Sequence, residues 1–424
     1  MRFSPVLAAV ALGLSIAAPA AAEPFVVLHD DGTIENQDLQ TLSDLKVLRE
    51  KLLALYAETG AETPEVLSVW SNFSLGGNYV GTVIDNLGNS VTGIGISPKT
   101  SPVPPLDAIL WHNDFTRLPQ RANVQRAPEE GFANYLFLLE LSHLWGPALK
   151  VPAPNAGALI GFTYHWSFFK SPPSPAGGND WTDNGDGTFT VVPQLPSQVK
   201  FAPIDLYIMG LVPPAEVPPF QVLENTVVPA TPTDPLWGGA FAAHSFPWFD
   251  QDQTLTITAT PRTITIDDVV AANGERLPVA GEKTSWKVGF VLLVSSKDDA
   301  ATLASDTQAF AEIAGGFAPF FETATSGKGT LEVVTEGVGM GGTGGTGGVG
   351  GAGATGGSGG TGETGGSGGG GAGGSQADPG GDESGSCGCE VAGADKRGEL
   401  AWIAALGAIA GLSRRGRPRR RAGR

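Results

Sequence analysis

The sequence predicts an α+β protein, because strand-like and helix-like segments occur in separate runs rather than in regular alternation. Two β-branched and aromatic runs, Val66–Trp70 and Leu106–Trp111, predict buried strands. The segment Glu130–His143 is apolar nearly all round, which is typical of a buried helix. The apolar run Lys287–Val294 then predicts another buried strand, and apolar spacing over Thr307–Thr323 predicts a final helix.

The N-terminus has the composition of a secretory signal peptide. Residues 1–22 combine Arg2, an apolar run and a small-residue end, Ala20-Ala21-Ala22. We therefore expect an exported protein whose folded body spans residues 23–335. Its first part, residues 23–62, is expected to be a helical segment, because leucines recur every three or four positions from Leu39 to Tyr56.

Shorter elements are predicted between these segments. Tyr79–Ile84 and Val91–Ile96 continue the strand pattern, and the Asp186-Gly187 step predicts a β-turn between two strands. Phe201–Pro214 reads as a short helix ended by Gly210 and proline. Two more strands are expected in the β-rich region that follows, at Leu255–Thr258 and Thr263–Ile266.

The charge and cysteine content narrow the functional classes. The chain carries 26 Lys and Arg against 43 Asp and Glu, for a net charge of −17, and many of the basic residues lie at the C-terminus. Such an acidic body argues against binding nucleic acid or an anionic membrane surface. The two cysteines, Cys387 and Cys389, both lie near the C-terminus, so the body has no disulfide although export would permit one.

The C-terminal part differs in composition from the body. Residues 336–381 are mostly glycine with Thr, Ser and Ala, which predicts a disordered, flexible linker. Residues 382–424 contain the Cys-Gly-Cys step, an apolar segment from Leu400 to Leu412 and an arginine-rich end. That apolar segment is shorter than the ~20 residues of a membrane-spanning helix.

Candidate chemistry lies in the segment Leu139-Glu140-Leu141-Ser142-His143. In the zinc motif H-E-x-x-H, two histidines one helical turn apart bind the metal and the glutamate polarises a bound water. Here Glu140 and His143 occupy the second and last positions, but Leu139 stands where the first histidine is expected. Because leucine has no lone pair to donate, the metal site is short of one ligand.

This segment and three downstream blocks resemble a group of secreted bacterial zincin-like metallopeptidase domains over about residues 60–335. The blocks are His165-Trp166-Ser167-Phe168-Phe169, Gly177-Gly178-Asn179-Asp180-Trp181 and Asp205-Leu206-Tyr207-Ile208-Met209-Gly210-Leu211. The resemblance implies a zincin-like fold with a mixed sheet and a buried active-site helix. It also implies His143 as a zinc ligand, Glu140 as the general base, and His165 or, as a weaker candidate, Asp205 as a further ligand.

The departure at Leu139 favours an inactive site that lacks zinc over one rescued by Asp205, because catalytic zinc needs three protein ligands. Each residue also has a plain structural alternative. His143 could be a hydrogen-bonded core histidine, Glu140 could pair with a buried partner, and Asp205 could cap a short helix.

The C-terminal tail resembles the MYXO-CTERM sorting signal. That resemblance implies cleavage near Cys387–Cys389 and attachment to the cell surface through a retained cysteine. The alternative is a plain C-terminal membrane anchor. Either way the acidic body is expected outside the cell, attached to the membrane through its C-terminal tail.

Three functions follow as hypotheses. The first is a cell-surface protein with an inactive metallopeptidase-like domain that acts in binding an extracellular protein or glycan, or in surface structure. The second is an active zinc metallopeptidase with a modified ligand set of His143, His165 and Asp205. The third is a carbohydrate- or protein-binding module that uses exposed aromatic residues such as Trp181.

Overall fold

The structure is a computed structural model. It describes residues 24–39, 42–76, 82–118, 131–151, 159–161, 164–228, 247–249 and 254–334, and the two-residue strand 386–387. The predicted signal peptide, the glycine-rich linker and all but two residues of the tail lie outside this part. Helices and a mixed sheet are both present, which confirms the α+β class.

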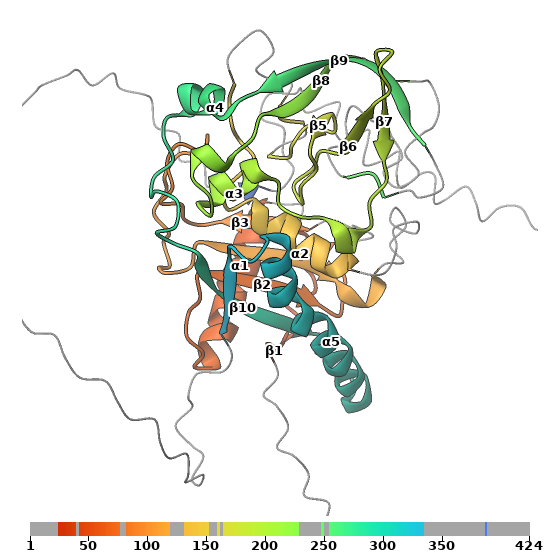
Figure 1. The fold of residues 1–424 in the computed structure, drawn as a ribbon. Coiled ribbons are helices and arrows are strands. Elements are labelled where there is room, and N and C mark those ends of the chain that lie inside the picture. The colour runs from red at the N-terminus through yellow and green to blue at the C-terminus, as the bar shows by residue number, and fades with distance from the viewer. Residues whose placement is uncertain are drawn as a thin grey trace, which may run out of the picture.

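A seven-stranded mixed sheet forms the centre of the body (Figure 1). Its strand order is β1-β10-β2-β4-β3-β12, with β11 also paired to β10. β3 and β12 are each in an antiparallel pair, whereas the other neighbours run parallel. The strands are β1 (Val26–His29), β2 (Val66–Ser71), β3 (Val83–Asn86), β4 (Ala108–Asp114), β10 (Ser285–Val294), β11 (Thr330–Val334) and β12 (Ser386–Cys387).

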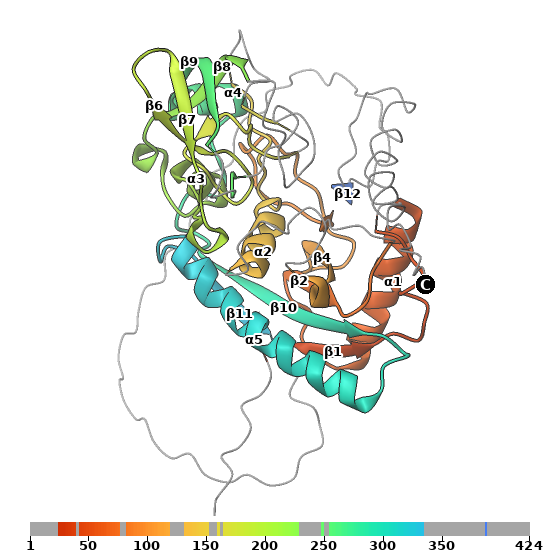
Figure 2. The ribbon, with the colours of Figure 1, turned by 90° about the vertical axis from the view of Figure 1, so that its right-hand side faces the viewer.

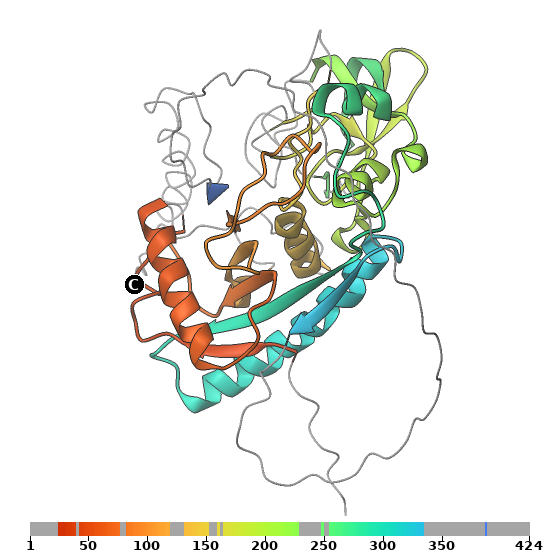
Figure 3. The same cartoon turned by 90° about the vertical axis from the view of Figure 1, so that its left-hand side faces the viewer.

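Helices cover both faces of this sheet, which explains why its central strands β2 and β4 are buried along their whole length. Along β2, Leu67 and Val69 pack into the cluster that contains leucines of α1 (Leu42–Glu58). The alternate residues Val66 and Trp70 pack into the larger cluster with α2 (Phe132–Ser142) and α5 (Ala300–Ala324). Figure 2 and Figure 3 show α1 and α5 on opposite sides of the sheet.

A second, five-stranded antiparallel sheet lies at one end of the body (Figure 1). Its order is β5-β8-β9-β7-β6, and its inner face has a small core of its own around Phe168 and Trp248. Two short helices, α3 (Pro203–Met209) and α4 (Ile266–Asn273), lie before β8 and after β9 in the chain. The strands are β5 (Lys170–Ser171), β6 (Asp180–Asp183), β7 (Thr188–Val192), β8 (Phe220–Val227) and β9 (Thr256–Ile264).

Two strand predictions are wrong. Val91–Ile96 forms no strand, because Gly93 and Gly95 adopt positive φ angles and lie against backbone carbonyls that a Cβ would strike. The two strands expected at Leu255–Thr258 and Thr263–Ile266 are one strand, β9, and Ile266 begins α4 instead.

The burial of Trp181 contradicts the third functional hypothesis, which needs this side chain to be exposed. Its side chain is only 9% exposed, it belongs to the core of the second sheet, and its indole N–H donates to the Phe168 carbonyl at 3.3 Å. A buried, hydrogen-bonded indole has no free face for a ligand, so Trp181 is not the exposed binding aromatic that the sequence suggested.

No helix among the described residues is both long enough and apolar enough to cross a membrane.

Thr265 caps α4, and removing its side chain should lower the stability of the fold. Its hydroxyl accepts from the Asp268 N–H at 3.3 Å, while the Asp268 carboxylate accepts from the Thr265 N–H at 2.9 Å. We expect Thr265→Ala to lower the free energy of unfolding by about 1 kcal/mol, as measured by urea denaturation. The exposed strand variant Thr263→Ala is the control and should shift it by less than about 0.5 kcal/mol. Equal effects of the two variants would contradict the role of the cap.

Candidate functional site

The candidate site is built on the last turn of α2. The helix begins after Gly131, which has a φ of 78° and lies so close to Ser197 that a Cβ would meet its backbone at 2.8 Å. It ends at Ser142, so His143 is the C-cap, still in a right-handed helical conformation. Every residue from Tyr135 to Ser142 is buried, as the apolar pattern predicts. Glu140 and His143 are therefore polar side chains inside the core.

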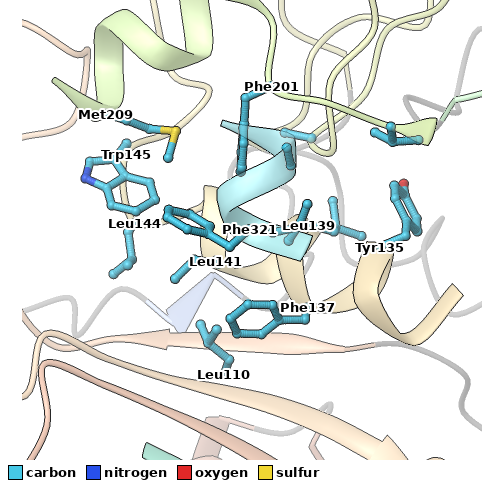
Figure 4. Packing of buried hydrophobic residues seen from close by; sticks show 14 of the residues in the cluster. Leu110, Tyr135, Phe137, Leu139, Leu141, Leu144, Trp145, Phe201, Met209 and Phe321 are labelled. Carbon is cyan, nitrogen blue, oxygen red and sulfur yellow. The ribbon is translucent and has the colours of Figure 1, made fainter. Parts of the chain in front are cut away.

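Leu139 is part of the hydrophobic core. Its side chain is 3% exposed and belongs to the larger core cluster, together with Tyr135 and Phe201 (Figure 4). The Leu139 carbonyl accepts a hydrogen bond from the Ser142 hydroxyl at 2.6 Å. The position that would carry the first zinc ligand is thus filled by an apolar side chain that packs against apolar neighbours.

His143 and His165 lie together, although 22 positions separate them in the chain. Their ring centroids are 4.7 Å apart, and the rings meet edge to face at 84°. The backbone around His165 is fixed by short bridges: the His165 carbonyl accepts from Gly161 N–H, and Trp166 N–H donates to the Ala176 carbonyl. The sequence-based pairing of these two histidines agrees with this geometry.

Burial keeps His143 neutral. Both histidines are about 5% exposed, and the Nδ1 atom of His143 has no hydrogen-bond partner. Burial, and secondarily the neighbouring His165, lowers the pKa of His143 well below its usual range; the backbone at Gly146 and Tyr164 acts in the opposite direction. A neutral imidazole is the form that binds metals.

Glu140 connects α2 to the edge of the central sheet. Its carboxyl group accepts a hydrogen bond from the hydroxyl of Thr82, the residue just before β3. Burial raises the pKa of Glu140 to about 7, against the lowering effect of the Thr82 hydrogen bond. The nearby Tyr135 hydroxyl has no hydrogen-bond partner, and burial, together with the charge of Glu140, raises its pKa.

The raised pKa of Glu140 predicts a pH-dependent stability. The folded protein holds the Glu140 proton up to about pH 7, whereas the unfolded chain releases it near pH 4.5. The folded state therefore binds more protons between these values, and stability is full below pH 4.5 and falls as pH rises through 7. We expect a loss of roughly 2–3 kcal/mol in the free energy of unfolding between about pH 5 and about pH 8, measured in urea. Glu140→Gln should lose most of this dependence; an unchanged slope would contradict the assignment.

Asp205 is held by a different set of groups. Its Oδ1 atom accepts from the Trp166 indole N–H at 2.7 Å, and its Oδ2 atom accepts from the Ala202 N–H at 3.0 Å. Lys170 Nζ lies 3.9 Å from Oδ2. The carboxylate is thus engaged by three donors on neighbouring elements, an arrangement that does not favour its use as a metal ligand.

The residues present do not fit a three-ligand zinc site. Within the described residues no group of three or more His, Cys, Asp or Glu side chains is close enough together to hold a metal ion. Two imidazoles meet, Leu139 offers no donor atom, and Asp205 is hydrogen-bonded elsewhere. Catalytic zinc requires three protein ligands and one open position.

The sequence predicts no role in this region for four residues: Thr82, Tyr135, Lys170 and Trp166. Lys170 carries the clearest signal, because a lone lysine ends the aromatic run Trp166-Ser167-Phe168-Phe169. A charged residue at the end of an apolar run suggests a buried partner, yet the sequence does not indicate which carboxylate supplies it.

No protein-family model, curated protein or solved structure matches this chain.

Proposed function

We propose that residues 23–335 form a zincin-like domain that has lost hydrolytic activity and acts in binding an extracellular protein or glycan, or in surface structure, at the cell surface. The observation that carries this proposal is the composition of the last turns of α2. Glu140 and His143 are retained beside His165, while Leu139 packs into the apolar core. This is the pattern expected of a metal site from which one ligand has been lost.

The architecture supports this origin. A mixed sheet is covered by a buried helix, and that helix carries Glu140 and His143. These are the two architectural features that the resemblance to zincin-like domains implies. The block around His165 follows in the expected order along the chain. The His165 ring lies against the His143 ring at the C-terminal end of α2.

The chemistry of the pair argues against efficient hydrolysis. Two imidazole ligands leave zinc weakly held, so the site would seldom contain a metal that could activate a water. Glu140 then has no activated water to accept a proton from. Its neutral form instead shares a hydrogen bond with Thr82 inside the core.

The ends of the chain support display outside the cell. The acidic body is preceded by a signal-like segment and followed by a glycine-rich stretch and a tail that resembles a sorting signal. A domain tethered in this way encounters extracellular proteins and glycans, which are the partner classes that we propose.

Metal analysis of the full-length protein tests the proposal. The protein is equilibrated with excess Zn²⁺, dialysed, and analysed for bound zinc per chain; it is also assayed for hydrolysis of unfolded protein substrates. We expect well below one zinc per chain and no hydrolysis that a chelator removes. Stoichiometric zinc together with chelator-sensitive hydrolysis would overturn the proposal.

The proximity of His143 and His165 favours one alternative, an active zinc metallopeptidase with a modified ligand set. In that case His143→Ala and His165→Ala should each abolish both zinc binding and hydrolysis, and Asp205→Asn should weaken both. An unrelated buried histidine variant, His112→Ala, is the control for general loss of structure.

A further inference from the structure

Lys170 is a lysine buried completely beside an aspartate. Its side chain is 0% exposed, and Nζ lies 3.9 Å from Oδ2 of Asp205. The same Nζ atom donates to the Pro172 carbonyl at 2.8 Å and lies 4.8 Å from the centre of the Trp166 ring. The amine and the carboxyl group thus share a site from which solvent is excluded.

The carboxyl group of Asp205 is surrounded by hydrogen-bond donors. The Trp166 indole donates to Oδ1, the Ala202 backbone N–H donates to Oδ2, and the Ser174 hydroxyl also hydrogen-bonds to the carboxyl group. Donors on both oxygens draw electron density away from Cγ. The carbon that an amine would attack is therefore polarised before any reaction.

Burial favours the uncharged forms of both partners. It lowers the pKa of Lys170 to about 8, against the opposite effect of Asp205, and it raises the pKa of Asp205. A neutral amine is a nucleophile, and a protonated carboxyl group is a far better acyl acceptor than a carboxylate. Fixed neighbours in a dry site also supply the high effective concentration that an uncatalysed condensation lacks in water.

We propose that Lys170 and Asp205 condense to form an intramolecular isopeptide bond. The lone pair of Nζ attacks Cγ of the protonated carboxyl group, and a C–N bond forms. One carboxyl C–O bond breaks, and the departing hydroxyl takes one proton from the amine and leaves as water. The products are one secondary amide and one water molecule, so no oxidant or further reactant is needed.

Such a bond fits the composition of this protein. The body contains no cysteine, and both cysteines lie at 387 and 389, so disulfides cannot crosslink the folded part. An amide between Lys170 and Asp205 would join β5 to α3 and close the segment between them, which carries Ser174 and the β6–β7 hairpin. A covalent link of this kind constrains the unfolded chain, as a disulfide does.

Peptide mapping of the full-length protein tests this proposal. The protein is denatured and digested with trypsin, which cleaves after Lys150, Lys170, Lys200 and Arg262 but not after an acylated lysine. We expect no cleavage at Lys170 and a branched species that joins residues 151–200 to residues 201–262. Its mass should be lower than the sum of those two peptides by one water molecule. Fragmentation should locate the bond between Lys170 and Asp205.

Two further results decide the interpretation. Lys170→Arg keeps a cation over Trp166 but removes the amine, so the branched species should disappear while residues 201–262 are recovered as a free peptide. Loss of water also follows from succinimide formation at an Asp-Gly step such as Asp186-Gly187. Cleavage at Lys170 in the unmodified chain, with residues 151–170 and 201–262 recovered separately, would overturn the proposal whether or not Asp186 has lost water.

Discussion

Replacing Leu139 by histidine is expected to give this protein a stoichiometric zinc site. Positions 139 and 143 are four apart on α2, so a histidine at 139 adds an imidazole on the helix face that carries His143. His165 already faces His143, with 4.7 Å between the ring centroids. The variant thus has the three protein ligands that a catalytic zinc site requires. We expect its zinc affinity to exceed that of the unmodified chain by roughly 100-fold or more.

The stability of Leu139→His measures zinc binding independently of hydrolytic activity. Without metal, an imidazole at the 3%-exposed position of Leu139 has to be buried among apolar side chains, which should cost roughly 1–3 kcal/mol. Zinc binds the folded state and should restore this loss in proportion to its concentration. Thermal unfolding with and without Zn²⁺ measures the effect. Recovery of chelator-sensitive hydrolysis is a second readout, because Glu140 is already in the position of the general base.

Matched variants distinguish the effect of a new zinc ligand from the effect of burying a polar side chain at position 139. Leu139→Asn buries a polar side chain without an imidazole and should be destabilised with no recovery in zinc. Adding His165→Ala to Leu139→His should abolish the gain in zinc affinity; a gain that survives would show that the third ligand is another residue. If Leu139→His itself binds no zinc, the site has lost more than one ligand and the zincin assignment is weakened.

The sequence predicted the elements whose local signals agree with their packing. α2 was predicted as a buried helix because its apolar residues surround it, and β10 as a buried strand because its apolar run is continuous. α3 ends at Gly210, whose φ of 84° is the left-handed conformation that glycine favours. The hairpin between β6 and β7 turns at Asp186-Gly187 as expected.

Predictions from local sequence were wrong where contacts between distant segments determine the secondary structure. Leu255–Thr258 and Thr263–Ile266 are predicted as separate strands, but Pro261 between them lies within β9, at a point where β7 no longer pairs with that strand. A proline is tolerated there because its missing N–H would face no partner. Thr265 and Ile266 are β-branched and are predicted to end the strand Thr263–Ile266. The reciprocal hydrogen bonds of Thr265 and Asp268 instead start a helix.

The residues of the candidate site, too, were predictable only where local sequence indicates their role. Glu140 and His143 were predictable because a known motif spacing connects residue type to chemistry, and His165 was implied by the resemblance to zincin-like domains. It could not supply Thr82 or Lys170, because these residues act through contacts with chain segments far away in sequence. The resemblance to zincin-like domains implies Asp205 as a weaker candidate for a metal ligand, beside the alternative of a helix cap. Its partners Trp166, Lys170 and Ala202 become visible only when the chain is folded.

Asp205→Ala is expected to cause one of the largest losses of stability of any single substitution in the body. The substitution removes the acceptor of the Trp166 indole and the Ala202 N–H, and it leaves the amine of Lys170 buried without its carboxylate. Removing Asp205 leaves Lys170 as an uncompensated buried charge, which costs about 3–5 kcal/mol, and the covalent link proposed between the two side chains is lost as well. Urea denaturation at neutral pH measures this loss, and zinc should not change it if Asp205 is structural.

Removing both charges tests whether the pair itself is responsible. In the double variant Lys170→Met with Asp205→Leu, no charge remains in the apolar site, so the stability lost to the buried charge should return, whereas the stability lost with the covalent link should not. Lys170→Met alone should resemble Asp205→Ala, because it leaves the carboxylate unpaired. If Asp205→Ala is instead tolerated without zinc but abolishes stability gained from zinc, Asp205 is a metal ligand after all. The Lys170–Asp205 site would then belong to the same centre as His143 and His165, and the case for an inactive domain would fall with it.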